Sequence, residues 1–206
     1  MPIRRLAILV ALVSLAGCLR PRPSPTPVRA DALSVAVYRA VAESIYVPTT
    51  GQRIAIATTS VDTTCRVENC APLVARWGFE RAWWDDADSA DASVAIAELI
   101  ARSGRSVDLR AVIAGRPMLT PATRDASPAP HAAEREWVAF RDAHEGAAGV
   151  LLFSPVGFTR SKRNAVLFVD WRCGPTCGHA LAATLGAVND STWRITNMLL
   201  LPDGVR

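Results

Sequence analysis

Two close pairs of cysteines stand out among the side chains of this 206-residue sequence. Cys65 and Cys70 are separated by four residues, and Cys173 and Cys177 by three. Pairs at such spacings can form disulfides, act as redox thiols, or bind zinc with His179 as a further ligand. The compartment in which the protein folds decides among these chemistries.

Carboxylates and a histidine form a second set of reactive groups. Asp85 and Asp86 follow two tryptophans, and His144 precedes a glutamate. Calcium loops need a glycine at the bend, which the aspartate cluster lacks, and a zinc-protease helix needs a second histidine. With these two metal sites set aside, our alternative hypothesis is a hydrolase or carbohydrate-active enzyme that uses Asp85, Asp86 or His144.

The N-terminus carries the most specific pattern of the chain. Two arginines precede an apolar run at residues 6–15, which has the length of a signal-peptide core and about half the length of a membrane span. The run ends in Leu15-Ala16-Gly17-Cys18, which resembles the lipobox of bacterial lipoproteins at every position. The resemblance implies that residues 1–17 are a signal peptide and that the sulfur of Cys18 carries lipid.

Residues 18–30 are rich in proline and arginine. Alternating prolines forbid a helix and favour an extended chain of about 3.1 Å per residue, so the twelve residues 19–30 of this tether reach roughly 37 Å. The signal peptide and the tether hold five of the 23 basic residues, which leaves 18 against 19 acidic ones in residues 31–206. This charge balance excludes a nucleic-acid partner, because a protein that binds nucleic acid carries a basic patch on its folded domain.

Export to an oxidising compartment favours disulfides over free thiols or a zinc site. Four cysteines allow three connectivities, and the short loops favour Cys173–Cys177 and Cys65–Cys70 over cross-pairing. The segment 171–177 is similar to the Trp-Cys-Gly-Pro-Cys motif of thioredoxins, but it has one more residue between the thiols. A strand is predicted after it, rather than the helix that lowers a redox thiol's pKa. We therefore expect structural disulfides, no metal and no other cofactor.

Periodicity predicts helices in the first part of the domain and strands in the last. Short connections between the last strands favour antiparallel pairing. The expected fold class is α+β, with N-terminal helices packed on one face of a C-terminal four-stranded antiparallel meander, all within one domain at residues 31–206. The predicted helices are 31–47 (ending before Pro48), 72–84, 91–103, 108–114 and 132–143. The predicted strands are 53–61, 149–153, 165–171, 179–188 and 192–201, with a proline loop at 120–130.

A set of short motifs is spread over residues 137–201. They are Trp137 and Phe140, the Phe-Ser-Pro-Val-Gly-Phe segment 153–158, the strand 165–169, the Cys-Gly-Pro-Thr-Cys-Gly segment 173–178, and Trp-Arg-Ile at 193–195. Together they resemble a family of uncharacterised exported bacterial proteins with a CGxxCG hairpin, from which Pro155 departs. The resemblance implies the fold and the cysteine hairpin, and it brings no established activity.

The sequence therefore predicts the location of the protein more firmly than its activity. We expect a lipoprotein of the bacterial cell envelope, held on the membrane by the lipid on Cys18, whose domain binds a ligand or protein partner. Leu19 follows the lipidated residue, at the position where an aspartate would retain the protein in the inner membrane. By resemblance to enterobacterial sorting signals, this implies the outer membrane in a host that has two membranes.

Overall fold

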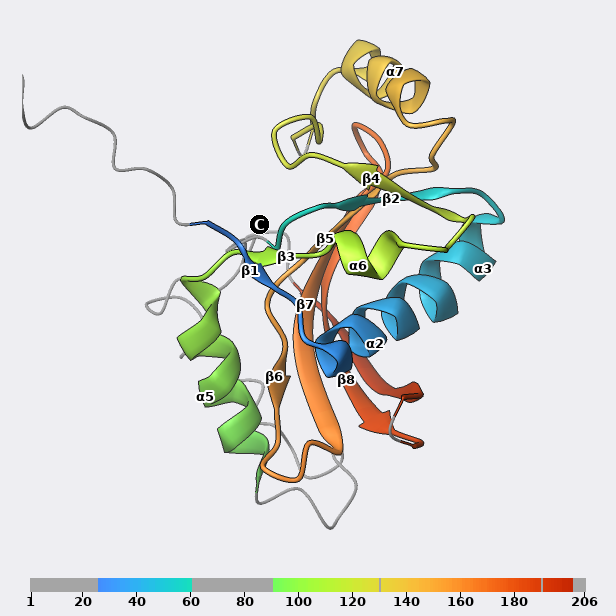
Figure 1. Cartoon of the computed structure of the whole chain (residues 1–206). Coiled ribbons are helices and arrows are strands. Elements are labelled where there is room, and N and C mark those ends of the chain that lie inside the picture. The colour runs from blue at the N-terminus through green and yellow to red at the C-terminus, as the bar shows by residue number, and fades with distance from the viewer. Residues whose placement is uncertain (1–25, 61–90, 130, 190, 202–206) are drawn as a thin grey trace, which may run out of the picture.

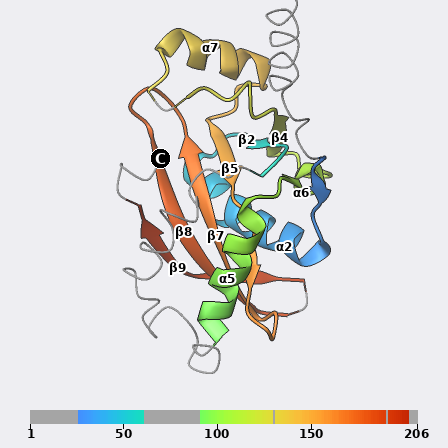
Figure 2. The ribbon, with the colours of Figure 1, turned by 90° about the vertical axis from the view of Figure 1, so that its left-hand side faces the viewer.

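A computed structural model describes residues 26–60, 91–129, 131–189 and 191–201 (Figures 1 and 2). The helix predicted at 72–84 lies outside these residues. The N-terminal elements are β1 (Val28–Arg29), α2 (Ala32–Val41), the π-helical turn η2 (Ala42–Tyr46), α3 (Val47–Thr50), β2 (Ile54–Ala57), α5 (Ala92–Ser103), β3 (Val107–Asp108), α6 (Arg110–Ile113), β4 (Leu119–Ala122) and α7 (Glu134–Ala143). The C-terminal strands are β5 (Val150–Phe153), β6 (Gly157–Phe158), β7 (Asn164–Arg172), β8 (Gly178–Ala187) and β9 (Trp193–Leu200).

A seven-stranded mixed sheet forms the centre of this α+β fold. Its order is β4-β2-β5-β7-β8-β9, with β6 paired to β7, and β1 and β3 form a separate parallel pair. The four predicted C-terminal strands are confirmed as the antiparallel run β5-β7-β8-β9. The prediction of a purely antiparallel four-stranded sheet was wrong, because β2 pairs in parallel with both β4 and β5. β4 and β5 lie far from β2 in the chain. The spacing of strands in the sequence predicts only hairpins, in which the paired strands follow one another.

The strand β4 replaces the first part of the loop predicted at 120–130. It lies at one edge of the sheet, and its exposed Pro121 stands opposite Ile56. Proline cannot donate to a neighbouring strand, so it is tolerated where one side of the strand has no neighbour. The prolines mark the edge of the sheet here, and the loop begins after Ala122.

The helices begin largely where the sequence predicts. The Asp31 carboxylate caps α2 by accepting from the N–H of Ser34 (2.7 Å), and α5 begins after Asp91 and ends at Gly104. The predicted end before Pro48 was wrong, since the helix continues to Thr50. The wider turn η2 interrupts the α-helical hydrogen bonding just before Pro48. Pro48 therefore stands in the first turn of α3, where a backbone N–H has no partner within the helix and is not needed.

Helices cover both faces of the sheet, whereas the sequence predicted one covered face. On β7, Leu167 and Val169 face the core beneath α2, while Val166 and Phe168 pack against α5. Farther along the second face, Trp137 of α7 packs over β2 and β5. No helix in the described part of the chain is long and apolar enough to cross a bilayer.

Candidate functional site

Several residues singled out by the sequence lie outside the described ranges. These are Cys18, Cys65, Cys70, Asp85 and Asp86. The lipidation site, the second disulfide and the carboxylate pair therefore stay predictions.

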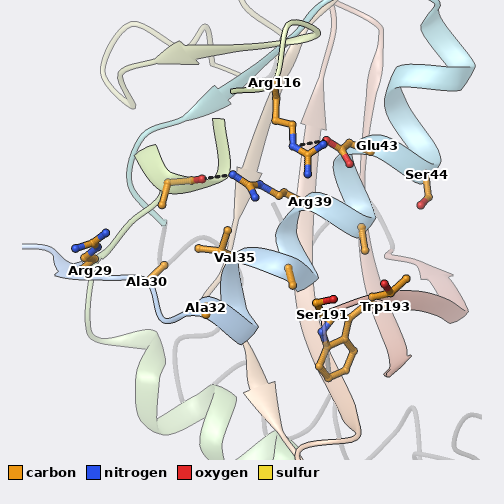
Figure 3. A pocket seen from close by; sticks show the side chains of 14 residues that line it. Arg29, Ala30, Ala32, Val35, Arg39, Glu43, Ser44, Arg116, Ser191 and Trp193 are labelled. Carbon is orange, nitrogen blue, oxygen red and sulfur yellow. Dashed lines mark hydrogen bonds and ion pairs between the residues drawn. The ribbon is translucent and has the colours of Figure 1, made fainter. Parts of the chain in front are cut away.

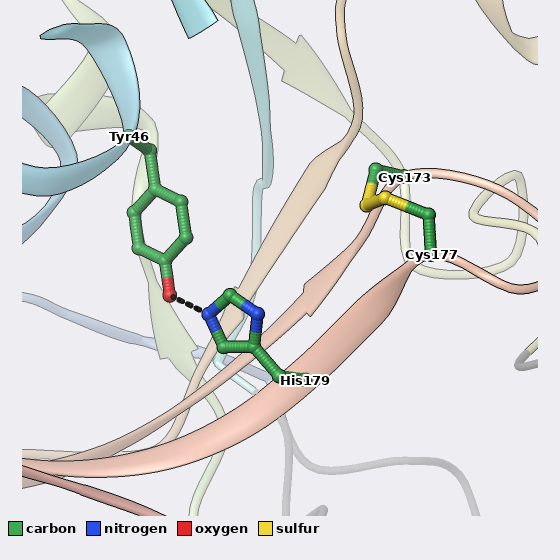
Figure 4. Close-up of a disulfide and its surroundings, with 4 residues drawn as sticks. All are labelled: Tyr46, Cys173, Cys177 and His179. Atoms are coloured by element: carbon green, nitrogen blue, oxygen red, sulfur yellow. Dashed lines mark hydrogen bonds between the residues drawn. A yellow bond between two sulfur atoms is a disulfide. The ribbon is translucent and has the colours of Figure 1, made fainter. Parts of the chain in front are cut away.

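The predicted bond between Cys173 and Cys177 is present at the turn from β7 to β8 (Figure 4). Their Cα atoms are 5.1 Å apart, and the N–H of Cys173 donates to the carbonyl of Cys177 (3.1 Å). The chain enters β8 directly after Cys177, so neither sulfur lies at a helix N-terminus that would stabilise a thiolate. This disulfide closes a hairpin.

Replacing both Cys173 and Cys177 by serine should lower the thermal unfolding midpoint without abolishing the fold. A bridge over so short a loop contributes about 2 kcal/mol, which corresponds to roughly 4–8 °C for a domain of this size. The double variant should be no less stable than either single variant, because it leaves no lone thiol to mispair. Calorimetry measures the shift, and peptide mapping without reduction checks the pairing; a Cys173 bonded to Cys65 or Cys70 would refute it.

The two predicted histidines lie in separate surroundings. His179 of β8 stacks on Tyr46, with its Nε2 3.3 Å from the tyrosine hydroxyl (Figure 4). His144 ends α7, where its Nδ1 lies 2.8 Å from the carbonyl of Phe140 and its ring stacks on the phenyl ring. Within the described ranges, no three His, Cys, Asp or Glu side chains come together in a way that could hold a metal ion.

A buried ion pair on β7 escaped the sequence interpretation. Asp170 is 4% exposed, and its Oδ2 lies 2.7 Å from an Nη atom of Arg172. Arg172 also donates to the carbonyl of Pro128 (3.2 Å), which ties the loop before α7 to the sheet. The sequence signal that could have indicated this pair was an aspartate within an otherwise apolar strand. The pair thus joins this loop to β7 through Arg172.

A groove of about 780 Å³ runs along α2 (Figure 3). Its floor consists of small side chains of the helix: Ala32, Val35, Ala36 and Ala40. Its polar rim consists of Arg29, Arg39, Glu43, Ser44, Arg116, Ser191 and Thr192. We call this the α2 groove; its volume falls in the ~300–1,000 Å³ range of ligand sites.

Two arginines of the α2 groove are held in place. Arg39 donates to the carbonyls of Ala111 (2.6 Å) and Val112 (3.0 Å), and so caps the end of α6. Arg116 forms an ion pair with Glu43 (3.1 Å). Figure 3 shows both guanidinium groups on the α6 side of the groove. On this side of the groove, both guanidinium groups are thus engaged by neighbouring residues.

A smaller cavity of about 230 Å³ involves the same short strand, β1. It shares Arg29 and Ala30 with the α2 groove, and we call it the β1 cavity. Tyr38 lines it, with a hydroxyl that donates to the carbonyl of Ser154 (3.0 Å). Arg102 and Arg105 reach it from the C-terminal end of α5.

Sequence reasoning missed both hollows. It assigned Arg29 to the tether at residues 18–30, and it gave no role to the arginines between residues 102 and 116. The surplus of arginine where the tether meets the domain was a weak signal, because only the fold brings β1, α2 and α5 together.

These two hollows form the candidate site, and both adjoin the segment through which the predicted tether enters the domain. Comparisons of the chain with family models, with curated proteins and with solved structures find no match.

Proposed function

We propose that this protein is a lipid-anchored lipoprotein of the bacterial envelope whose domain binds a ligand or partner in the α2 groove. The observation that carries the proposal is the place of the groove. Arg29, at the end of the tether predicted from the lipobox, lines it directly. Binding would thus occur at the anchored end of the chain.

The strand β1 fastens the tether to the domain at this point. The N–H of Val28 donates to the carbonyl of Ser106 (2.9 Å), and the N–H of Ala30 donates to that of Asp108 (3.3 Å). Both bonds hold Arg29 beside the end of α5 and the beginning of α2. The groove thus keeps its position relative to the tether.

The lining of the groove favours an elongated ligand with one apolar side. The alanines and Val35 of α2 offer a smooth apolar floor, while Ser44, Ser191 and Thr192 offer hydroxyl groups along the rim. Ligand sites typically combine such an apolar surface with a few fixed polar groups. Arg29 adds a charge that suits a carboxylate or phosphate at one end of the ligand.

The enzyme hypothesis gains no support from the described residues. One ring nitrogen of His144 is engaged by the end of its own helix, and the carboxylates of Asp85 and Asp86 lie outside the described ranges. The outer membrane, inferred from Leu19, stays part of the proposal. So does kinship with the exported family that residues 137–201 resemble.

Replacing Cys18 by serine should abolish lipidation. The sulfur is the atom that receives lipid, and acyl chains supply the anchor at about 0.8 kcal/mol per buried methylene. We expect the variant to lose labelling by a palmitate analogue and to accumulate uncleaved or soluble. The matched control is Cys173→Ser, which should label like the wild type; equal labelling of the Cys18 variant would contradict the lipobox assignment.

Filling the α2 groove should prevent binding. Ala36→Trp places an indole on the floor, whereas Val138→Trp adds the same bulk to an exposed site on α7, where Val138 is 45% exposed. We expect the wild type and the Val138 variant, purified from membranes in mild detergent, to carry a bound mass in native mass spectrometry that the Ala36 variant loses. A mass retained by Ala36→Trp, or absent from all three proteins, would argue against the groove.

A further inference from the structure

The β1 cavity carries an excess of positive charge. Three guanidinium groups, those of Arg29, Arg102 and Arg105, reach a space of about 230 Å³ that has one carboxylate, Asp31, on its wall. That carboxylate accepts from the N–H (2.7 Å) and the hydroxyl (3.1 Å) of Ser34 as the cap of α2, and its Oδ2 lies 3.9 Å from an Nη atom of Arg102.

The three arginines differ in what neutralises them. Arg102 is held by Glu98 (2.5 Å), which fixes its guanidinium at the cavity. Arg105 forms no ion pair in the described part of the chain, and neither does Arg29, although the charge of Arg29 helps to lower the pKa of Asp108. Asp108 stands opposite Arg29 in the β1–β3 pair, but Arg110 binds both of its oxygens. Within the described part of the chain, Arg105 thus has no counter-ion, and Arg29 shares Asp108 with Arg110.

The size and chemistry of the cavity match a phosphate group. Its volume corresponds to about seven or eight water molecules at ~30 Å³ each, enough for a phosphate and a short alcohol. Planar guanidinium groups bind phosphate oxygens in pairs, and they do so better than the point charge of lysine. We propose that the β1 cavity binds a phosphate monoester or diester, held by Arg29 and Arg105 and oriented by Arg102.

Such a phosphate has two sources, a soluble phosphate ester or the headgroup of an anionic phospholipid. The headgroup is in reach if the lipid anchor exists, since Arg29 is the residue at which the tether joins the domain. This choice of source rests on the proposed function, whereas the cavity and its charges do not. One experiment distinguishes the two sources.

The experiment follows hydrogen–deuterium exchange of residues 26–31 and 102–108 in the intact lipoprotein. In detergent, the protein is titrated with glycerol 1-phosphate; in vesicles, phosphatidylcholine alone is compared with phosphatidylcholine containing phosphatidylglycerol. The variants are Arg105→Gln, which removes one cavity charge, and Arg135→Gln, which removes an exposed charge on α7. Loss of one charged hydrogen-bonding group should weaken binding about tenfold or more.

We expect slower exchange at both segments with phosphate, lost in Arg105→Gln and kept in Arg135→Gln. Slowing by glycerol phosphate assigns a soluble ester, and slowing only in vesicles with phosphatidylglycerol assigns the headgroup. No slowing under either condition, or an equal effect of the two variants, would overturn the proposal. If Cys18 proves not to be lipidated, the proposed anchor fails while the titration with glycerol phosphate still tests the cavity.

Discussion

A single methyl group added at Gly157 is expected to destabilise the fold severely. A Cβ at this position in β6 would run into the carbonyl oxygen of Ala95, and it would lie 2.8 Å from the backbone nitrogen of Leu99. Both atoms belong to the backbone of α5, so no side chain can swing aside to make room. Gly157→Ala should cost about 3 kcal/mol or more, which lowers the unfolding midpoint by roughly 6–12 °C.

Gly104→Ala is the matched control for this prediction. Gly104 follows α5 with a φ of −76°, and nothing lies within 4 Å of a Cβ built there. The added methyl should leave the midpoint unchanged or raise it slightly, because it restricts the unfolded chain. Thermal and urea unfolding followed by circular dichroism compare the two variants. Equal stability of the two would show that α5 and β6 do not pack as closely as described.

Raising the pH above about 10 is expected to destabilise the protein strongly through its two tyrosines. Tyr38 and Tyr46 are 0% and 3% exposed, and burial raises the pKa of both phenols above the usual value. The charge of Asp31 adds to this effect at Tyr38, and that of Asp170 adds to it at Tyr46. The folded state therefore keeps both protons at a pH where the unfolded chain has lost them.

The sign of the effect follows from linkage. A raised pKa in the folded state leaves stability intact below the unfolded pKa of about 10 and removes it as the pH rises further. The free energy of unfolding should fall by about 1.4 kcal/mol per pH unit for each tyrosine, and by about 3 kcal/mol for both. Between pH 10 and about 12 the loss is about 6 kcal/mol, which matches the lower end of the usual stability of about 5–15 kcal/mol.

Urea unfolding at a series of pH values between 8 and about 12 tests this. Tyr38→Phe and Tyr46→Phe should each halve the slope, and the double variant should remove it. The protein has two tyrosines, so phenolate absorbance reports on these groups alone. Phenolate that forms near pH 10 with the fold intact, or an unchanged slope in the double variant, would contradict the burial of these side chains.

Local features of this protein were predictable from its sequence because their causes are local. The helix between Asp91 and Gly104 ends at a glycine, and its apolar spacing creates the face that it buries; Asp91 stands at its start without a capping hydrogen bond from its side chain. The antiparallel pairing of β7, β8 and β9 follows from the short turns between them. The bond between Cys173 and Cys177 follows from a loop too short to separate them.

The sheet's parallel half and the candidate site depend on contacts between segments far apart in the chain. Ile54 of β2 pairs with Leu119, and its neighbour Ala55 pairs with Val150; no local pattern encodes such a register. Arg29 and Arg105 are likewise separated by most of the N-terminal half, and they meet because β1 pairs with β3. Charge placement at the cavity is thus a product of long-range strand pairing, which composition and periodicity do not contain.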